Sequence, residues 1–181
     1  MRNPRASVRD MIISMLVLLV PVVAIYWFFN VEPDEPTVTA VAVAPTLATA
    51  RAESPFPILA PTNLPDTWKP TRVTWAKPGD ALIGGEIATS HVWVLGVLSP
   101  DKVYLALETR DTPAATFVKD ATREGANDGT STLGGQVWTR YLSSDARTRS
   151  LVLTTDDVTT VISGDTSYSA LEAYAGTLSA G

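Results

Sequence analysis

The hydrophobic positions of this chain follow two patterns, one unbroken and one periodic. Residues 11–29 contain no charged side chain and are almost all apolar. At about 1.5 Å of rise per residue, a helix of this length reaches roughly 28 Å, close to the roughly 30 Å of a bilayer's hydrocarbon core. The unbroken pattern therefore predicts one transmembrane helix over residues 11–29.

The charges on either side of this segment indicate its orientation. Three basic residues precede it: Arg2, Arg5 and Arg9. The acidic sequence EPDEP follows it closely. Because basic flanks tend to stay inside, we expect a cytoplasmic tip at residues 1–10, a single span and an extracytoplasmic remainder, held at the plasma membrane. A cleaved secretory signal is the alternative, but small residues for cleavage do not directly follow the apolar run.

Beyond residue 54 the apolar positions recur at strand and helix periods. Thr71, Val73 and Trp75 would share one face of an extended segment. Further strand-like runs follow, namely HVWVLGVL, VYLALET, QVWTRYL, RSLVLTT and VTTVISG. Segments of helical spacing, DTPAATFVKDATREG and DTSYSALEAYAGTL, come after the third and the sixth strands. The intervening EGANDGTSTLGG is predicted to be a loop.

This order predicts an α+β fold, with an antiparallel sheet and two helices packed on one face. Since three strands and a helix occur twice, an internal duplication of a βββα unit is one explanation. Residues 30–54 are predicted to be an extracytoplasmic stalk, with an edge strand over residues 38–43 and a short helix over residues 46–53. The folded domain is expected at residues 55–181, with a proline-rich lead before its first strand.

Composition narrows the possible functions. The 181-residue chain has a net charge of −5 and no cysteine, which excludes disulfides, thiolate nucleophiles and cysteine metal sites. No basic patch is present outside the membrane, so nucleic acid is not a predicted partner.

Candidate catalytic residues are few. His91 is the only histidine, and no Gly-x-Ser-x-Gly motif accompanies it. Glu108 and Asp111 are the closest approach to a carboxylate pair, and we expect them to solvate a strand end and help to cap the next helix. We therefore predict no catalytic residues, no metal site, no cofactor and no enzymatic activity.

The strongest binding candidates lie in VWTRYL and just after it. In a strand, Trp138 and Arg140 would share one face, and Tyr141 would lie on the other. A guanidinium stacked on an exposed ring recognises carboxylates, glycans or proteins well, so Trp138, Arg140, Tyr141 and Arg149 form the predicted binding set. The alternative is that Arg140 covers Trp138 as ordinary packing.

Several blocks resemble a known family. They are ARAESPFPILAPTNLPDTWKPTRVTW, HVWVLGVLSPDKVYLALE, VWTRYLSSDARTRSLVL and LEAYAGTL, after a basic tip and one apolar span. In this order they resemble the actinobacterial single-pass membrane proteins of domain-of-unknown-function family 4245. The resemblance implies a mycolic-acid-type or related Gram-positive envelope and no established activity.

From these features we expect a membrane-anchored extracytoplasmic binding or scaffolding module of the cell envelope, with a membrane protein of the envelope as partner. Two alternatives stay open. One is an envelope stress sensor, because LPDTWKPTRVTW is loosely similar to openings of domains attached to anti-sigma factors. The other is a hydrolase of wall glycan or lipid.

Overall fold

The computed structural model describes residues 8–29, 39–155 and 158–180, in two units that we describe separately. In the first unit, α1 (Val8–Phe29) confirms the predicted apolar helix. Its window Asp10–Trp27 has a mean hydropathy of 2.2, and none of that window is buried. The helix thus has the length and composition of a membrane span, properties that a signal sequence shares. Most of the predicted cytoplasmic tip, and the first part of the stalk, lie outside the described residues.

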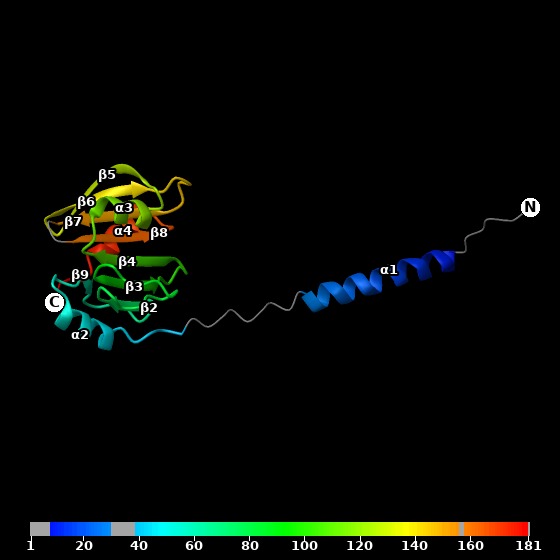
Figure 1. Cartoon of the computed structure of the whole chain (residues 1–181). Coiled ribbons are helices and arrows are strands. Elements are labelled where there is room, and N and C mark those ends of the chain that lie inside the picture. The colour runs from blue at the N-terminus through cyan, green and yellow to red at the C-terminus, as the bar shows by residue number, and fades with distance from the viewer. Residues whose placement is uncertain (1–7, 30–38, 156–157, 181) are drawn as a thin grey trace, which may run out of the picture. The chain divides into compact units, whose positions relative to one another are not determined.

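The second unit is built around a large sheet (Figure 1). Its helices are α2 (Ala44–Glu53), α3 (Ala114–Ala121) and α4 (Tyr168–Ala175). Its strands are β1 (Ala60–Pro61), β2 (Lys69–Ala76), β3 (Val92–Leu98), β4 (Tyr104–Arg110), β5 (Ala126–Leu133), β6 (Gln136–Leu142), β7 (Arg149–Thr154), β8 (Thr159–Gly164) and β9 (Leu178–Ser179). Seven of them form one sheet in the order β2-β3-β4-β8-β7-β6-β5, and β1 pairs with β9.

All neighbouring strands of the large sheet are antiparallel. The α+β fold with a large antiparallel sheet is therefore confirmed. The strands predicted from VWVLGVL, YLALET, QVWTRYL, RSLVLT and TTVISG all form, because their β-branched and aromatic residues suit a pleated surface.

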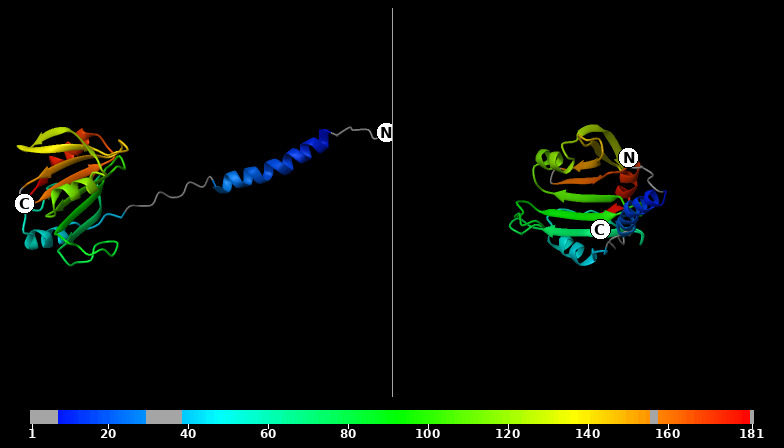
Figure 2. Two further views of the ribbon diagram at one scale, coloured as in Figure 1. Left: turned by 45° about the horizontal axis from the view of Figure 1, so that its top comes forward. Right: turned by 90° about the vertical axis from the view of Figure 1, so that its right-hand side faces the viewer.

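The two helices that follow the strand triplets lie on opposite faces of the sheet (Figure 2). Leu151 of β7 clusters with Leu171 of α4, whereas the next residue, Val152, clusters with Phe117 of α3. The prediction that both helices pack on one face is therefore wrong. The reason is that β7 and β8 are apolar on both faces, and a strand of this kind needs cover on both sides.

The segment predicted as a loop contains β5, an edge strand whose exposed polar residues do not alternate with apolar ones. A two-residue turn joins it to β6, and Gly134 and Gly135 both have positive φ, as this hairpin requires. The strand order fits the suggested duplication. The helices do not fit it, because a twofold axis perpendicular to the sheet would place both of them on the same face.

The face that carries α4 holds the main core, and we call it the α4 face. Its fully buried side chains include Trp93, Leu107 and Leu151. The proline-rich lead closes one side of this core with Ile58, and α2 adds Ala50. The lead and α2 are thus parts of the folded unit.

Residues near the start of the second unit differ from their prediction. Residues 39–43 form no strand and are joined to β2 by a bond from Val41 N–H to Pro70 O at 2.8 Å. Val38, the first residue of the predicted edge strand, lies outside the described residues. The helix predicted for residues 46–53 is confirmed by α2.

Candidate functional site

The face opposite the main core, which we call the α3 face, is only partly covered. A seven-stranded sheet is about 29 Å wide at about 4.8 Å per strand, and a helix with its side chains is about 10 Å across. The eight-residue α3 lies over β8, and the loop of residues 77–91 covers Val92 and Val94 of β3. Hollows therefore remain on both sides of α3.

The first hollow lies between α3 and the strands β6 and β7. It has a volume of about 420 Å³. Val118 of α3 and Val152 of β7 give it apolar walls, and Thr139 and Tyr141 of β6 add hydroxyl groups. We call it the β6 hollow. A concave, mostly apolar surface with a few polar groups and this size is typical of ligand sites.

On the other side of α3, two adjoining hollows of about 540 and 480 Å³ share Glu108, Asp120 and Ala121. We call the pair the charged groove. Its larger hollow is lined by the cations Arg72, Lys102 and Arg123.

The larger hollow is deep because small residues of neighbouring strands lie side by side at its base. Arg72 of β2 pairs with Gly96, Gly96 pairs with Ala106, and Ala106 pairs with Ser163. Tyr104 lies over Gly96, where a Cβ atom would be only 2.2 Å from the tyrosine hydroxyl. Burial raises the pKa of Tyr104 above its usual value, although the charge of Arg72 lowers it. Tyr104 is therefore a neutral hydroxyl donor at neutral pH.

Three of the predicted binding residues lie on the α4 face. Trp138 is buried, at 3% exposure, as a member of the main core. Arg140 donates from Nε to Ser131 Oγ at 2.7 Å and pairs with Glu172 of α4. Ser131 also donates to Glu172, at 2.6 Å. Hydrogen bonds from Ser131 and Arg140 lower the pKa of Glu172.

The ring that the arginines contact is Tyr168 of α4. The guanidinium carbons of Arg140 and Arg149 lie 4.8 and 5.7 Å from its centroid. Arg149 also donates to Thr166 O at 3.1 Å. Burial raises the pKa of Tyr168 to about 12. The structure thus brings Arg140 and Arg149 together, but around a ring that strand alternation could not reveal.

Tyr141 is separated from the other three residues. It lies on the α3 face and lines the β6 hollow, as strand alternation predicted. The arginines and Trp138 have structural partners on the other face, and of the four residues Tyr141 is the one that lines any of the three hollows described above. A role in binding for each of the four stays a prediction.

Sequence reasoning missed Arg72 and Tyr104. One available signal was Gly96, since an isolated glycine inside a strand often marks a close approach by another group. The approaching group here is Tyr104 from the neighbouring strand.

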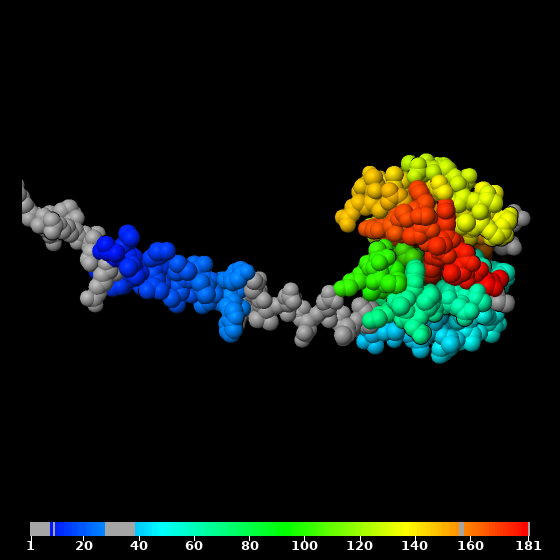
Figure 3. Space-filling model, turned by 180° about the vertical axis from the view of Figure 1, so that it is seen from behind, coloured from blue at the N-terminus to red at the C-terminus, as the bar shows by residue number. Residues whose placement is uncertain are grey.

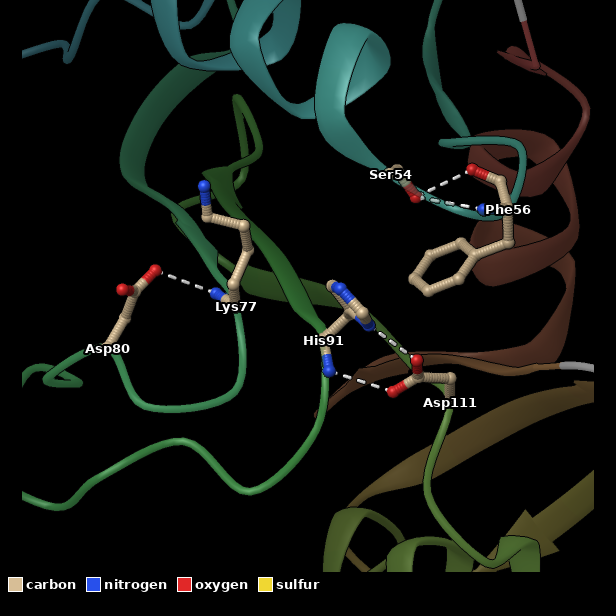
Figure 4. Close-up of polar contacts among 6 residues, drawn as sticks. All are labelled: Ser54, Phe56, Lys77, Asp80, His91 and Asp111. Atoms are coloured by element: carbon tan, nitrogen blue, oxygen red, sulfur yellow. Dashed lines mark hydrogen bonds and ion pairs between the residues drawn. The ribbon is translucent and has the colours of Figure 1, made fainter.

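His91 sits at the start of β3 and is held by Asp111 (Figure 4). Its Nδ1 lies 2.6 Å from Asp111 Oδ2, and its backbone N–H donates to Asp111 Oδ1 at 2.7 Å. Its ring stacks on Trp75 at 5.8 Å. Ser54, drawn in the same view, donates its hydroxyl to Phe56 O at 2.7 Å instead. The hydrogen bonds described for His91 go to Asp111, and none of them joins it to a serine hydroxyl.

The two suggested carboxylates have separate partners. Glu108 lies 3.6 Å from Arg110, and Asp111 binds His91, so Asp111 caps no helix. α3 begins after Pro113 without a side-chain cap. In the described residues, no group of three or more His, Asp or Glu side chains is placed to hold a metal ion.

Comparison with known proteins identifies the family. The profile of a family described as protein of unknown function (DUF4245) matches residues 4–178. The chain belongs to the DUF4245 family. No curated protein and no solved structure matches the chain. DUF4245 membership therefore assigns no activity to the chain.

Proposed function

We propose that this protein is a membrane-anchored extracytoplasmic module that binds a partner or ligand of the cell envelope through its α3 face. The observation that carries the proposal is the difference in cover between the two faces. Trp93, Leu107 and their neighbours fill the α4 face, whereas hollows of about 420, 540 and 480 Å³ flank α3.

The anchor in this proposal is α1. Its apolar length suits a bilayer, and the three arginines before it favour a cytoplasmic amino terminus. The second unit would then be outside the membrane. A fusion of alkaline phosphatase after residue 180 should be active, and an inactive fusion would contradict this orientation.

Binding is favoured over hydrolysis because His91 and Asp111, the pair best suited to acid–base chemistry, line none of the three hollows. Glu108 does line the charged groove, and it lies beside Arg110. In contrast, the β6 hollow and the charged groove combine apolar walls with polar side chains, which is the usual construction of a recognition surface.

Site-specific photocrosslinking in intact cells tests the binding face. A photoreactive p-benzoylphenylalanine would replace Ala115 at the β6 hollow, or Thr116 at the charged groove, in separate variants. The matched control replaces Ser169 of α4, which is also exposed but lies on the other face. We expect discrete adducts from Ala115 or Thr116 and none from Ser169. Adducts of equal yield from all three positions, or from none, would contradict the proposal.

A further inference from the structure

We propose that the larger hollow of the charged groove binds an oxyanion, namely a phosphate or carboxylate group, with Arg72 as its main contact. The inference deepens the proposed function and rests on it, since it assigns a ligand chemistry to one part of the α3 face.

The side chain of Arg72 has no hydrogen-bond or ion-pair partner within the described part of the chain. Its Nε–H is buried and makes no hydrogen bond. Arg72 also takes no part in the ion pairs found there. A buried donor without a partner is costly, and a guanidinium matches the geometry of phosphate and carboxylate groups.

Two of the carboxylates that line this hollow have partners of their own. Glu108 lies beside Arg110 at 3.6 Å. Asp165 accepts a hydrogen bond from the Thr148 hydroxyl and lies 3.6 Å from Arg147. Neither acid forms an ion pair with Arg72 in the part of the chain that the structure describes.

The cations and carboxylates of the groove are unevenly distributed. Arg123 lines the same hollow as Arg72, whereas Glu86 lines only the other hollow. Asp120 belongs to both hollows and lies on the α3 wall. Because like charges repel, an anion is favoured at the Arg72 end of the groove and disfavoured at the Glu86 end.

Neutral donors complete the site. The Tyr104 hydroxyl lies over Gly96, the direct strand neighbour of Arg72. Ser163 lies on the floor of the same hollow. Arg72 would supply the charge, and these hydroxyl groups would supply further hydrogen bonds to the oxygen atoms of the ligand.

Isothermal titration calorimetry on the full chain in detergent micelles tests the inference. The probes are inorganic phosphate, glycerol 1-phosphate as a headgroup phosphate, N-acetylalanine as a peptide carboxylate, and the neutral amide of N-acetylalanine. We expect saturable binding of at least one anion and none of the amide. The anion that binds more tightly identifies the source, phosphate ester or peptide carboxylate.

Two arginine variants make this test specific. Arg72→Gln should weaken binding about tenfold or more, because it removes a charge-assisted contact. Arg51→Gln changes an exposed arginine of α2 that lines none of the hollows, and it should bind as the natural chain does. No saturable binding, or equal weakening in both variants, would overturn the inference.

The photocrosslinking experiment separates the two proposals. If Ala115 and Thr116 positions give adducts while no anion binds at Arg72, the oxyanion site is wrong and the proposed function stands. If an anion binds at Arg72 but neither position gives adducts, the α3 face binds a small anionic ligand, and the part of the proposed function that invokes a macromolecular partner is wrong.

Discussion

The two faces of the sheet differ in how completely they are covered, although the same strands build both. On the α4 face, Trp93 and Leu107 are fully buried in the main core, to which α2, the proline-rich lead and α4 all contribute. Figure 3 shows this side of the second unit, with the red segment of α4 lying over it. On the α3 face, one short helix and one loop cover separate parts of the sheet, and Tyr104 is 45% exposed.

This difference separates the stabilising part of the domain from its recognition surface. Each Å² of apolar area removed from water contributes roughly 25 cal/mol to the stability of the fold. The α4 face, which buries more apolar side chains, therefore contributes most of the stability. The α3 face has polar and charged residues in its hollows, where substitutions should change binding more than they change the stability of the fold. The predictions below test this division.

The largest loss of stability is expected when a core side chain of the α4 face is truncated. Trp93 has 0% exposure, and its Nε1–H donates to Leu59 O at 3.0 Å. Trp93→Ala should lower the free energy of unfolding by about 4 kcal/mol. Val94 is the next residue and lies on the α3 face. Val94→Ala should lower the free energy of unfolding by about 1.5 kcal/mol, because the loop of residues 77–91 can move into the space that the side chain leaves. Urea unfolding followed by circular dichroism measures both, and equal losses would contradict the division.

A smaller loss is expected for the network around Tyr168. Arg140→Ala leaves Glu172 and Ser131 without their shared partner and should cost about 1 kcal/mol. Arg149→Ala removes one bond to Thr166 O and should cost about 0.5 kcal/mol. If Arg140→Ala left stability unchanged but abolished the crosslinks from the α3 face, the structural role given to Arg140 would be wrong.

The same network predicts a pH dependence. Because the pKa of Glu172 is lowered in the folded state, its contribution is complete above the ordinary glutamate pKa of about 4.3. The contribution is lost as the pH falls through the lowered folded value. Unfolding free energies measured across this window should fall less steeply for Glu172→Gln than for the natural chain. Parallel profiles would show that Glu172 contributes nothing.

Gly96→Ala should change stability little, yet this change should alter the charged groove. Its new Cβ would displace only the far end of Tyr104, so the cost should stay below about 1 kcal/mol. Tyr104 would become more exposed, and its pKa should fall toward the usual value because burial is the main cause of its shift. Ultraviolet titration against Tyr104→Phe isolates this tyrosine. An unchanged titration would show that the hydroxyl does not lie over Gly96 in solution.

The local pattern of apolar and polar residues predicted most of the helices and strands, but it did not predict how they are arranged in space. The alternation from Thr71 to Trp75 predicted β2 correctly, and the helical spacing before Leu178 predicted α4. β5 was missed because an exposed edge strand buries little and carries no apolar alternation. The residue-level prediction for VWTRYL placed Tyr141 on the correct face, but Tyr168 comes from a helix more than twenty residues away.

The sequence by itself determined the apolar helix α1, most of the strands and helices and the family, because each follows from local periodicity or from the order of its residues. The tertiary structure decided which face each helix covers, and so left the α3 face open around Arg72 and Tyr104. Helix placement depends on how far each face of the whole sheet is already buried, and that quantity is a property of the assembled strands and of no single segment.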